Sequence, residues 1–234
     1  MFKAICCSAK VGSAEDIGKE VNVAKRFPDR KPFLMEVLEV ISISEKDNDT
    51  RIAMITPLYA APLHDFTGRR CLELFVRVAV CTLLSIREFN RIGFCHGDIK
   101  PRNLMVNNNS KFVTMIDFGE SSRYGTEIMK DSAMYPMDCV RTASLRYDLT
   151  CLASTLWELW QGRAAVEINT RQELRVAVAS CENKLVGSII TACLEESPAV
   201  MSGIFDDTFH AVLQLVETDE VAHLLLPNEI RVEC

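Results

Sequence analysis

The sequence predicts an α+β protein with a small β-rich N-terminal part and a larger, mainly helical C-terminal part. In residues 1–60, short apolar runs alternate with polar residues or are rich in β-branched residues, as strands are. Beyond residue 66, apolar residues recur every three to four positions over long segments, as in buried helices. The chain of 234 residues is long enough for one large domain or two small lobes.

The N-terminal part contains three segments with strand character. Residues 20–27, "EVNVAKRF", alternate apolar and polar positions and predict a half-buried strand. Residues 51–59, "RIAMITPLY", predict a second strand that ends at Pro57. Between them, residues 33–43 remain ambiguous, since the apolar residues share a helical face and the β-branched residues would also suit a strand.

The C-terminal part contains long helical patterns with clear ends. Residues 71–92 carry a 3.6-residue apolar period and precede a glycine, which predicts a long helix. Residues 147–161 predict a buried helix that also ends at a glycine, and its two tryptophans are expected to pack in the core. Thr170 and Glu173 form a capping box that opens another helix. Residues 204–216 suggest one more.

Composition and charge narrow the functional classes. Apolar residues make up 48% and charged residues 25% of the chain, as in ordinary folded proteins. The net charge of −6 argues against nucleic-acid partners, whose recognition depends on clustered Lys and Arg. The longest apolar run includes Glu73 and Arg77 and therefore predicts a core helix, not a membrane span. We expect no membrane partner and no signal peptide.

The ten cysteines are scattered among apolar neighbours, with no C-x-x-C pair and no zinc-like spacing to the four histidines. This pattern predicts free, mostly buried thiols in a reducing intracellular compartment. We expect a cytoplasmic protein, and the nucleus is also compatible with the sequence.

The stretch "FCHGDIKPRNLMV", residues 94–106, brings together the side chains that phosphoryl transfer needs. Asn103 and, fourteen residues later, Asp117 lie next to strand-like runs, so one β-hairpin would bring both to one site. Two oxygen ligands of this kind suit a divalent metal beside a triphosphate. Asp98 would accept the proton of an attacking hydroxyl, and Lys100 would neutralise charge on the moving phosphoryl group.

The segment "HGDIKPRN" followed by "DFG" resembles the catalytic loop and metal motif of eukaryotic-type serine/threonine protein kinases. The resemblance implies a two-lobed protein-kinase-like fold in one domain, with an N-lobe at about 1–57, a hinge at about 57–62 and a C-lobe at about 63–234. It implies Mg²⁺-assisted transfer of the γ-phosphoryl group of ATP to a Ser or Thr of a protein substrate. Asp98 and Lys100 would be catalytic, and Asn103 and Asp117 would hold the metal.

The resemblance also implies a nucleotide site. "NVAKRF" is similar to the third-strand V-A-x-K of the family, which makes Lys25 the phosphate-binding lysine and Glu36 its ion-pair partner on the next helix. "ITPLY" resembles the hinge, with Thr56 as gatekeeper. The nucleotide-binding residues implied in all are Ile5, Ala24, Lys25, Glu36, Thr56, Pro57, Leu58, Tyr59 and Met105.

Two further segments resemble structural elements of the family. Asp148, in "YDLTCLASTLWEL", stands where a buried aspartate anchors the catalytic-loop backbone. "YPMDC" stands in place of the A-P-E motif, with Asp138 for Glu. His96 is expected to be a packed core histidine because Asp98 already supplies the base.

The sequence also departs from the family pattern. "MFKAICCSA" resembles only the tail of the glycine-rich loop, the first strand has no counterpart, and the segment between Glu36 and the hinge is shorter by about one strand. Either a truncated chain or a degenerate kinase would account for this. Gly97 replaces the arginine that in the family pairs with an activation-loop phosphate, which predicts activity independent of that pairing.

Two alternatives therefore remain open. A pseudokinase would act as a binding or scaffold module, as the missing glycine-rich loop suggests. A small-molecule phosphotransferase of the aminoglycoside- or choline-kinase-like type also carries "HGD" with an asparagine five residues later. The sequence leaves open the protein substrate, the pathway, the activation-loop phosphosites and the oligomeric state.

Overall fold

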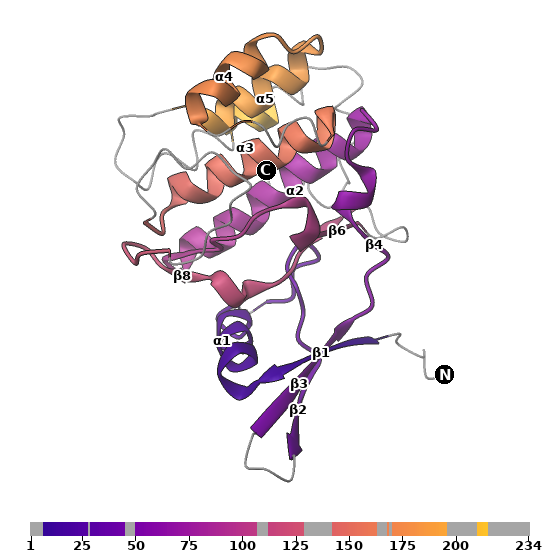
Figure 1. Ribbon diagram of the computed structural model, residues 1–234, viewed down its shortest axis with the longest axis vertical. Coiled ribbons are helices and arrows are strands. Elements are labelled where there is room, and N and C mark those ends of the chain that lie inside the picture. Colours follow the sequence, from indigo (N-terminus) through magenta and orange to yellow (C-terminus); the bar gives the residue numbers. More distant parts are fainter. Residues whose placement is uncertain are drawn as a thin grey trace.

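The computed structural model describes residues 7–27, 29–44, 50–106, 112–128, 142–162, 168, 170–195 and 210–214. A small antiparallel sheet with one helix lies at one end, and a larger group of helices lies at the other (Figure 1). Short strand pairs and loops lie between these two parts. This mixed α/β architecture confirms the predicted α+β class and the two-lobed, kinase-like arrangement.

The N-lobe sheet contains three strands. They are β1 (Cys7–Ser13), β2 (Glu39–Ser44) and β3 (Thr50–Pro57), in the spatial order β1-β3-β2 with antiparallel pairing. The predicted strand that ends at Pro57 is confirmed as β3. The ambiguous residues 33–43 end in strand β2, and residues 33–38 before it form a loop with one isolated bridge, so the strand interpretation is correct for residues 39–43.

Helix α1 (Ala14–Ala24) replaces the strand predicted for residues 20–27, and that prediction is wrong. The side chain of Ser13 caps the helix by accepting from Asp16 N–H at 3.0 Å. Acidic residues in the first turn also favour the helix N-terminus. Ile17 and Val21, four residues apart, are buried against the rest of the lobe. The alternation that suggested a strand is part of this helical face.

The C-lobe is built on α2 (Leu72–Arg91) and α3 (Leu145–Gln161), and both predicted helices are confirmed. Gly93 and Gly162, just beyond their ends, have positive φ values of 69° and 81°, which glycine adopts without steric penalty. Both hydrogen bonds of the predicted capping box are present at the start of α4 (Arg171–Ala179), which packs against α5 (Lys184–Leu194). Residues 210–214 are helical, and the other residues of the predicted segment 204–216 lie outside the described ranges.

In the described part of the chain, eight short elements lie in the segments directly before α2 and between α2 and α3. They are β4 (Ala61–Pro62), η1 (Leu63–Phe66), β5 (Phe94–Cys95), η2 (Pro101–Asn103), β6 (Leu104–Val106), β7 (Val113–Met115), η3 (Phe118–Glu120) and β8 (Ser122–Arg123).

The core of the C-lobe lies between α2 and α3. Both helices are buried on most of their surfaces, and each large apolar side chain in such a core contributes about 1.5–3 kcal/mol of transfer free energy. Trp157 and Trp160 are 7% and 8% exposed, and Trp160 packs edge-on against Phe75 at a centroid distance of 5.7 Å. Their predicted core role is confirmed.

The seven cysteines in the described ranges, namely 7, 71, 81, 95, 151, 181 and 193, are all free thiols, as predicted. Burial raises the pKa of Cys81 to about 11 and that of Cys193 to about 12, so these two thiols are protonated near neutral pH. None of the helices in the described part of the chain has the length and apolarity that a membrane crossing requires.

Candidate active site

A β-hairpin brings Asn103 and Asp117 together, as the sequence predicted. Strands β6 and β7 pair antiparallel, with Leu104 opposite Met115. One step further, the backbone N–H of Ile116 donates to the carbonyl oxygen of Asn103 at 2.9 Å. Asp117 is the next residue, and its φ of 65° is in the left-handed region that non-glycine residues seldom adopt. Backbone conformations of this kind cluster at functional sites.

Asp98 is the centre of the predicted catalytic triplet. Its carboxylate oxygen Oδ2 accepts from Lys100 Nζ at 2.6 Å and from Asn103 Nδ2 at 2.9 Å. The other oxygen, Oδ1, is buried and has no hydrogen-bond partner among the described residues. A buried carboxylate oxygen without a partner is unfavourable unless a ligand supplies the missing hydrogen. Oδ1 is therefore available to an incoming hydroxyl.

Asn103 and Asp117 fit the donor set of a magnesium ion. Asn103 Nδ2 also donates to the backbone oxygen of Asp98 at 2.9 Å, so the side-chain oxygen of Asn103 remains for coordination. Among the described residues, no group of three or more His, Cys, Asp or Glu side chains is arranged to hold a metal ion. Mg²⁺ typically binds through one or two protein oxygens together with substrate phosphates, so two ligands suffice.

Lys10, on β1, lies at the place that the sequence assigned to Lys25. Lys10 Nζ is 2.7 Å from Glu20 Oε2 on α1 and 2.7 Å from Asp117 Oδ1. The Glu20 side chain is only 2% exposed, and its Oε1 also accepts from the backbone N–H of Phe118 at 3.1 Å. Glu20 thus joins α1, β1 and the segment after β7 in one network.

The charges of this network shift the pKa values of its members. Partial burial lowers the pKa of Lys10, but the hydrogen bonds and charges of Asp117 and Glu20 outweigh it, and the pKa is raised overall. Burial likewise raises the pKa of Asp117, but the hydrogen bond and charge of Lys10 outweigh it and hold the pKa below its usual range. Both groups are therefore charged at neutral pH.

The predicted pair of Lys25 and Glu36 is wrong. Lys25 is the C-cap of α1, and Glu36 forms an ion pair with Arg30. Ala24 is the last residue of α1, not a strand residue beside the phosphate-binding lysine. All three line a second pocket, separate from the Lys10 network. The signal that sequence reasoning missed is the helix start at Ser13, which makes the preceding "SAKVG" the lysine-bearing strand.

This correction also removes one apparent departure from the family pattern. Both β2 and β3 lie between Glu20 and the hinge. The missing strand was inferred by counting from Glu36 to the hinge. Glu20, not Glu36, is the ion-pair partner of Lys10, so the count started too late in the chain. Among the described residues, Cys7–Ala9 precede Lys10 on β1.

Two residues predicted to bind nucleotide, Thr56 and Met105, lie on strands at the two sides of the connection between the lobes. Thr56 is opposite Ser8 in the β1–β3 ladder, and their hydroxyl oxygens are 2.9 Å apart. Because alternate strand residues share a face, Thr56 and Ser8 lie on the same face as Lys10. Met105 lies on β6, opposite Pro62.

The other hinge residues follow at the end of β3. Leu58 is 58% exposed, and Pro57 and Tyr59 line the second pocket. The carbonyl oxygen of Pro57 also accepts from Ser8 Oγ at 3.4 Å, and the contact of these residues with adenine stays a prediction. Two predicted positions, Ile5 and Asp138, lie outside the described residues.

Asp148 fixes the backbone of the catalytic loop, as predicted. Its Oδ2 accepts from His96 N–H at 2.8 Å, and its Oδ1 accepts from Gly97 N–H at 3.0 Å. The thiol of Cys95 donates to Oδ1 at 3.1 Å. Burial raises the pKa of this thiol, and the Asp148 charge raises it further, so the thiol keeps the proton that it donates. Burial also raises the pKa of Asp148 itself.

Gly97 has a steric reason that the sequence did not reveal. Its φ is 81°, and a Cβ atom at this position would lie 2.8 Å from the carbonyl oxygen of Glu120. An arginine here would require both an unfavourable backbone conformation and displacement of that carbonyl. Gly97 therefore allows the loop to pack closely against η3. This is a second reason for the glycine, beside the lack of need for a phosphate-binding arginine.

His96 is a packed core residue, as predicted, and also positions the loop. It is fully buried, and its ring packs edge-on against Phe89 and Phe118 at centroid distances of 5.4 and 5.8 Å. Its Nδ1 accepts from the backbone N–H of Asp98 at 3.2 Å. Nε2 therefore carries the proton and donates to the carbonyl of Ile116 at 3.2 Å. His96 thus holds the Asp98 loop against the segment that leads to Asp117.

Comparison with known proteins agrees with this geometry. Residues 83–177 match a phosphotransferase enzyme family, a range that contains the catalytic loop, Asp117 and α3. The chain is also 30% identical over 119 residues to the serine/threonine-protein kinase Kist of Mus musculus, and equally to that of Homo sapiens. These alignments cover 47% of this chain and 28% of each relative, so the chain spans little more than a quarter of their length.

Together, the two-lobed fold and these matches support a place in the protein-kinase-like phosphotransferase superfamily. The family match begins inside α2, at residue 83, so the Lys10–Glu20 pair in the N-lobe is a structural observation independent of it.

Proposed function

We propose that the chain transfers the γ-phosphoryl group of Mg-ATP to a serine or threonine hydroxyl of a protein substrate. The observation that carries the proposal is the buried Asp98 Oδ1, which lacks a partner among the described residues while Lys100 and Asn103 hold the other oxygen. This arrangement leaves one carboxylate oxygen free to accept the proton of a substrate hydroxyl.

In this proposal each side chain has a defined part. Asp98 accepts the hydroxyl proton at Oδ1 while the hydroxyl oxygen bonds to the γ-phosphorus and the bond to the β–γ bridging oxygen breaks. Lys100 stays bonded to Asp98 Oδ2 and offsets negative charge near the transferred group. Lys10, held by Glu20, binds phosphate oxygens. Asn103 and Asp117 hold Mg²⁺, which when bound neutralises charge on the phosphates.

The protein acceptor is supported by the similarity to the serine/threonine-protein kinase Kist and by the lysine two residues after Asp98, which resembles the serine/threonine-type pattern. A second candidate is a small-molecule phosphotransferase with a hydroxyl acceptor on a drug or amino alcohol. It is favoured by the phosphotransferase family match and by "HGD" with Gly97 in the middle. Both candidates use the same Asp98 chemistry.

The test uses the 234-residue chain with radiolabelled ATP and Mg²⁺, offered casein in one reaction and aminoglycosides or choline in another. We expect labelled casein or self-labelling on serine or threonine, reduced about 100-fold or more by Asp98→Asn. Asp65→Asn, on an exposed aspartate of η1, is the matched control and should retain activity.

The outcomes separate the candidates. Label found only in the small molecule would establish the second candidate. Nucleotide binding that Asp117→Ala does not weaken would contradict the metal site. A folded chain that binds no nucleotide would favour a scaffold function over either enzyme.

A further inference from the structure

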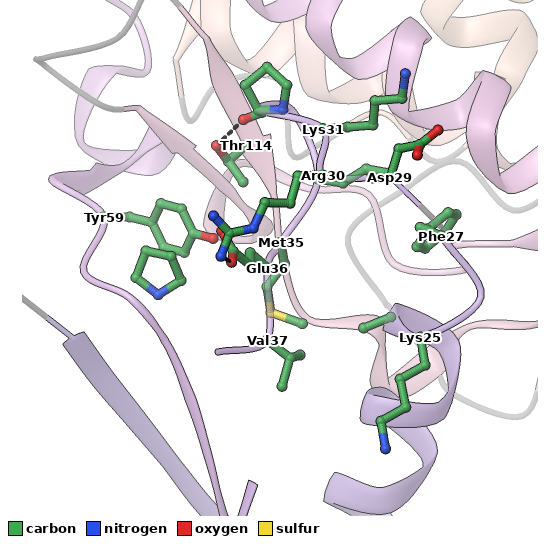
Figure 2. A pocket seen from close by; sticks show the side chains of 14 residues that line it. Lys25, Phe27, Asp29, Arg30, Lys31, Met35, Glu36, Val37, Tyr59 and Thr114 are labelled. Atoms are coloured by element: carbon green, nitrogen blue, oxygen red, sulfur yellow. Dashed lines mark hydrogen bonds and ion pairs between the residues drawn. The ribbon is translucent and has the colours of Figure 1, made fainter. Parts of the chain in front are cut away.

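A second pocket lies behind the connection between the lobes. Its volume is about 670 Å³, within the usual range for small-molecule sites. Its walls come from the end of α1, the loop of residues 29–37, the interlobe residues Pro57 and Tyr59, and Thr114 on β7 (Figure 2). None of the side chains of the Lys10 network or the catalytic loop lines it. It is therefore a separate site.

The wall formed by residues 29–37 is tied to both lobes. On the C-lobe side, Thr114 Oγ1 donates to the carbonyl of Pro32 at 2.8 Å, as Figure 2 shows, and Met35 N–H donates to Met115 at 2.8 Å. On the N-lobe side, Leu38 N–H donates to the carbonyl of Ile55 at 2.8 Å. A ligand in this pocket would thus contact elements of both lobes at once.

The pocket combines an apolar surface with charged side chains, of which three are cationic (Lys25, Arg30 and Lys31) and two acidic (Asp29 and Glu36). Met35, Val37 and the Tyr59 ring supply the apolar surface. The Arg30 guanidinium points toward Glu36 and the Tyr59 hydroxyl (Figure 2) and forms an ion pair with Glu36. The Arg30 side chain is 78% exposed, and a guanidinium carries five N–H donors, so donors remain for a ligand.

Tyr59 adds a hydrogen-bond donor beside the arginine. Burial raises the pKa of Tyr59 to about 12, so its hydroxyl is protonated at all physiological pH values. An anion bound to Arg30 could accept a second hydrogen bond from this hydroxyl. The adjacent apolar side chains would contact the remainder of the ligand.

We propose that this pocket binds a small amphiphilic anion, with a planar or aliphatic apolar body and a single carboxylate or sulfonate on Arg30, and that its occupancy strengthens nucleotide binding. The coupling rests on the position of α1. Ala24 and Lys25 line the pocket, and Glu20 lies one turn earlier on the same helix, about 6 Å along its axis. A ligand that fixes the end of α1 also holds Glu20 at Lys10. The coupling, but not the binding, depends on the proposed function.

The binding is tested with 1-anilinonaphthalene-8-sulfonate, which has an aromatic body and one sulfonate. Fluorescence titration of the folded chain should show one saturable site. Arg30→Gln should weaken binding at least fivefold, whereas Arg91→Gln should leave it unchanged. Arg91 is the matched control because it is also exposed, at 60%, and paired with one glutamate, Glu88, at the end of α2.

A second pair of variants tests the location by filling space. Val37→Trp should abolish binding, whereas Ser188→Trp, in the pocket between α4 and α5, should not affect it. Circular dichroism confirms that each variant is folded, and if Val37→Trp unfolds, the two arginine variants decide. Binding that persists in Arg30→Gln, or is lost equally in Arg91→Gln, would overturn the site.

The coupling is tested by calorimetric titration of Mg-ADP with and without saturating probe. We expect ADP to bind at least threefold more tightly in its presence, and linkage requires the probe to gain the same factor from ADP. If the probe binds without changing the affinity for ADP, the proposed coupling is wrong, while the proposed binding site is still supported. Failure of ADP to bind in either condition would count against the proposed function, while the fluorescence result would still support the pocket.

Discussion

Replacing Lys10 by methionine should disable the site, whereas the same change at Lys25 should not. Lys10 bonds two carboxylates at 2.7 Å, one of them on the almost fully buried Glu20. Lys25 is exposed, and its side chain makes no hydrogen bond or ion pair with other described residues. Methionine retains most of the aliphatic length of lysine and removes the charge. The two variants therefore differ in that Lys10→Met takes the cation from a pair of carboxylates and Lys25→Met does not.

The contacts allow the loss of stability to be estimated. Without Lys10, Glu20 keeps only the Phe118 N–H, and loss of a charge-assisted hydrogen bond at a buried group costs about 1.5–3 kcal/mol. The bond to Asp117 adds at most about 1 kcal/mol because the two side chains are 48% and 39% exposed. The total of about 1.5–4 kcal/mol corresponds to a Tm lower by about 3–16 °C. Lys25→Met should stay within about 0.5 kcal/mol.

The functional loss should exceed the loss of stability. Removing a cation that binds transferring phosphate costs on the order of 10²–10³ in rate. Thermal denaturation and Mg-ADP calorimetry on both variants, followed by phosphoryl transfer, give the comparison. Glu20→Gln retains the side-chain shape and should reproduce part of the Lys10→Met effect. Equal losses in Lys10→Met and Lys25→Met, or a larger loss in the latter, would refute the assignment of Lys10.

Three further predictions concern the scaffold of the site. In thermal denaturation, Gly97→Ala should destabilise the chain by at least about 1 kcal/mol more than Gly125→Ala. Both glycines have φ above 80°, but only at Gly97 would an added Cβ collide with a backbone carbonyl, that of Glu120. Equal destabilisation by the two variants would contradict this reasoning. Asp148→Ala leaves the backbone N–H groups of His96 and Gly97 without their acceptor. Denaturant titration should therefore show the free energy of unfolding lowered by about 3 kcal/mol or more. Full stability and activity in this variant would disprove the anchoring role of Asp148. Burial raises the pKa of Tyr59 from 10 in the unfolded chain to about 12 in the folded protein. The resulting contribution to folding stability is fully present below pH 10 and is lost as the pH rises toward about 12. Between pH 10 and 11.5 the wild type should therefore lose up to about 2 kcal/mol of folding stability more than Tyr59→Phe does. Parallel curves for the two proteins would argue against a raised pKa of this partly buried hydroxyl.

The parts of the structure that could be predicted from sequence are those with a strong local signal. In α2 and α3, the apolar period runs over four or more turns, and a glycine with positive φ ends each helix, so both were predicted correctly. The catalytic loop was predictable because its residues are neighbours in the sequence. Spacings of two and five residues keep Lys100 and Asn103 near Asp98, and in the structure both donate to its carboxylate.

The nucleotide lysine was not predictable in the same way because its partners are distant in sequence. "VAKRF" around Lys25 is a better match to the expected letters than "SAKVG" around Lys10, and letter matching alone favours Lys25. What decides between them is the helix that begins after Ser13, since a lysine at the C-cap of α1 cannot also lie on a strand facing that helix. Once α1 is placed, Glu20 is the only acidic residue on its buried face, and a buried carboxylate requires a cation. Lys10 supplies that cation, which explains why a single error in secondary structure displaced the lysine, its partner and the strand count together.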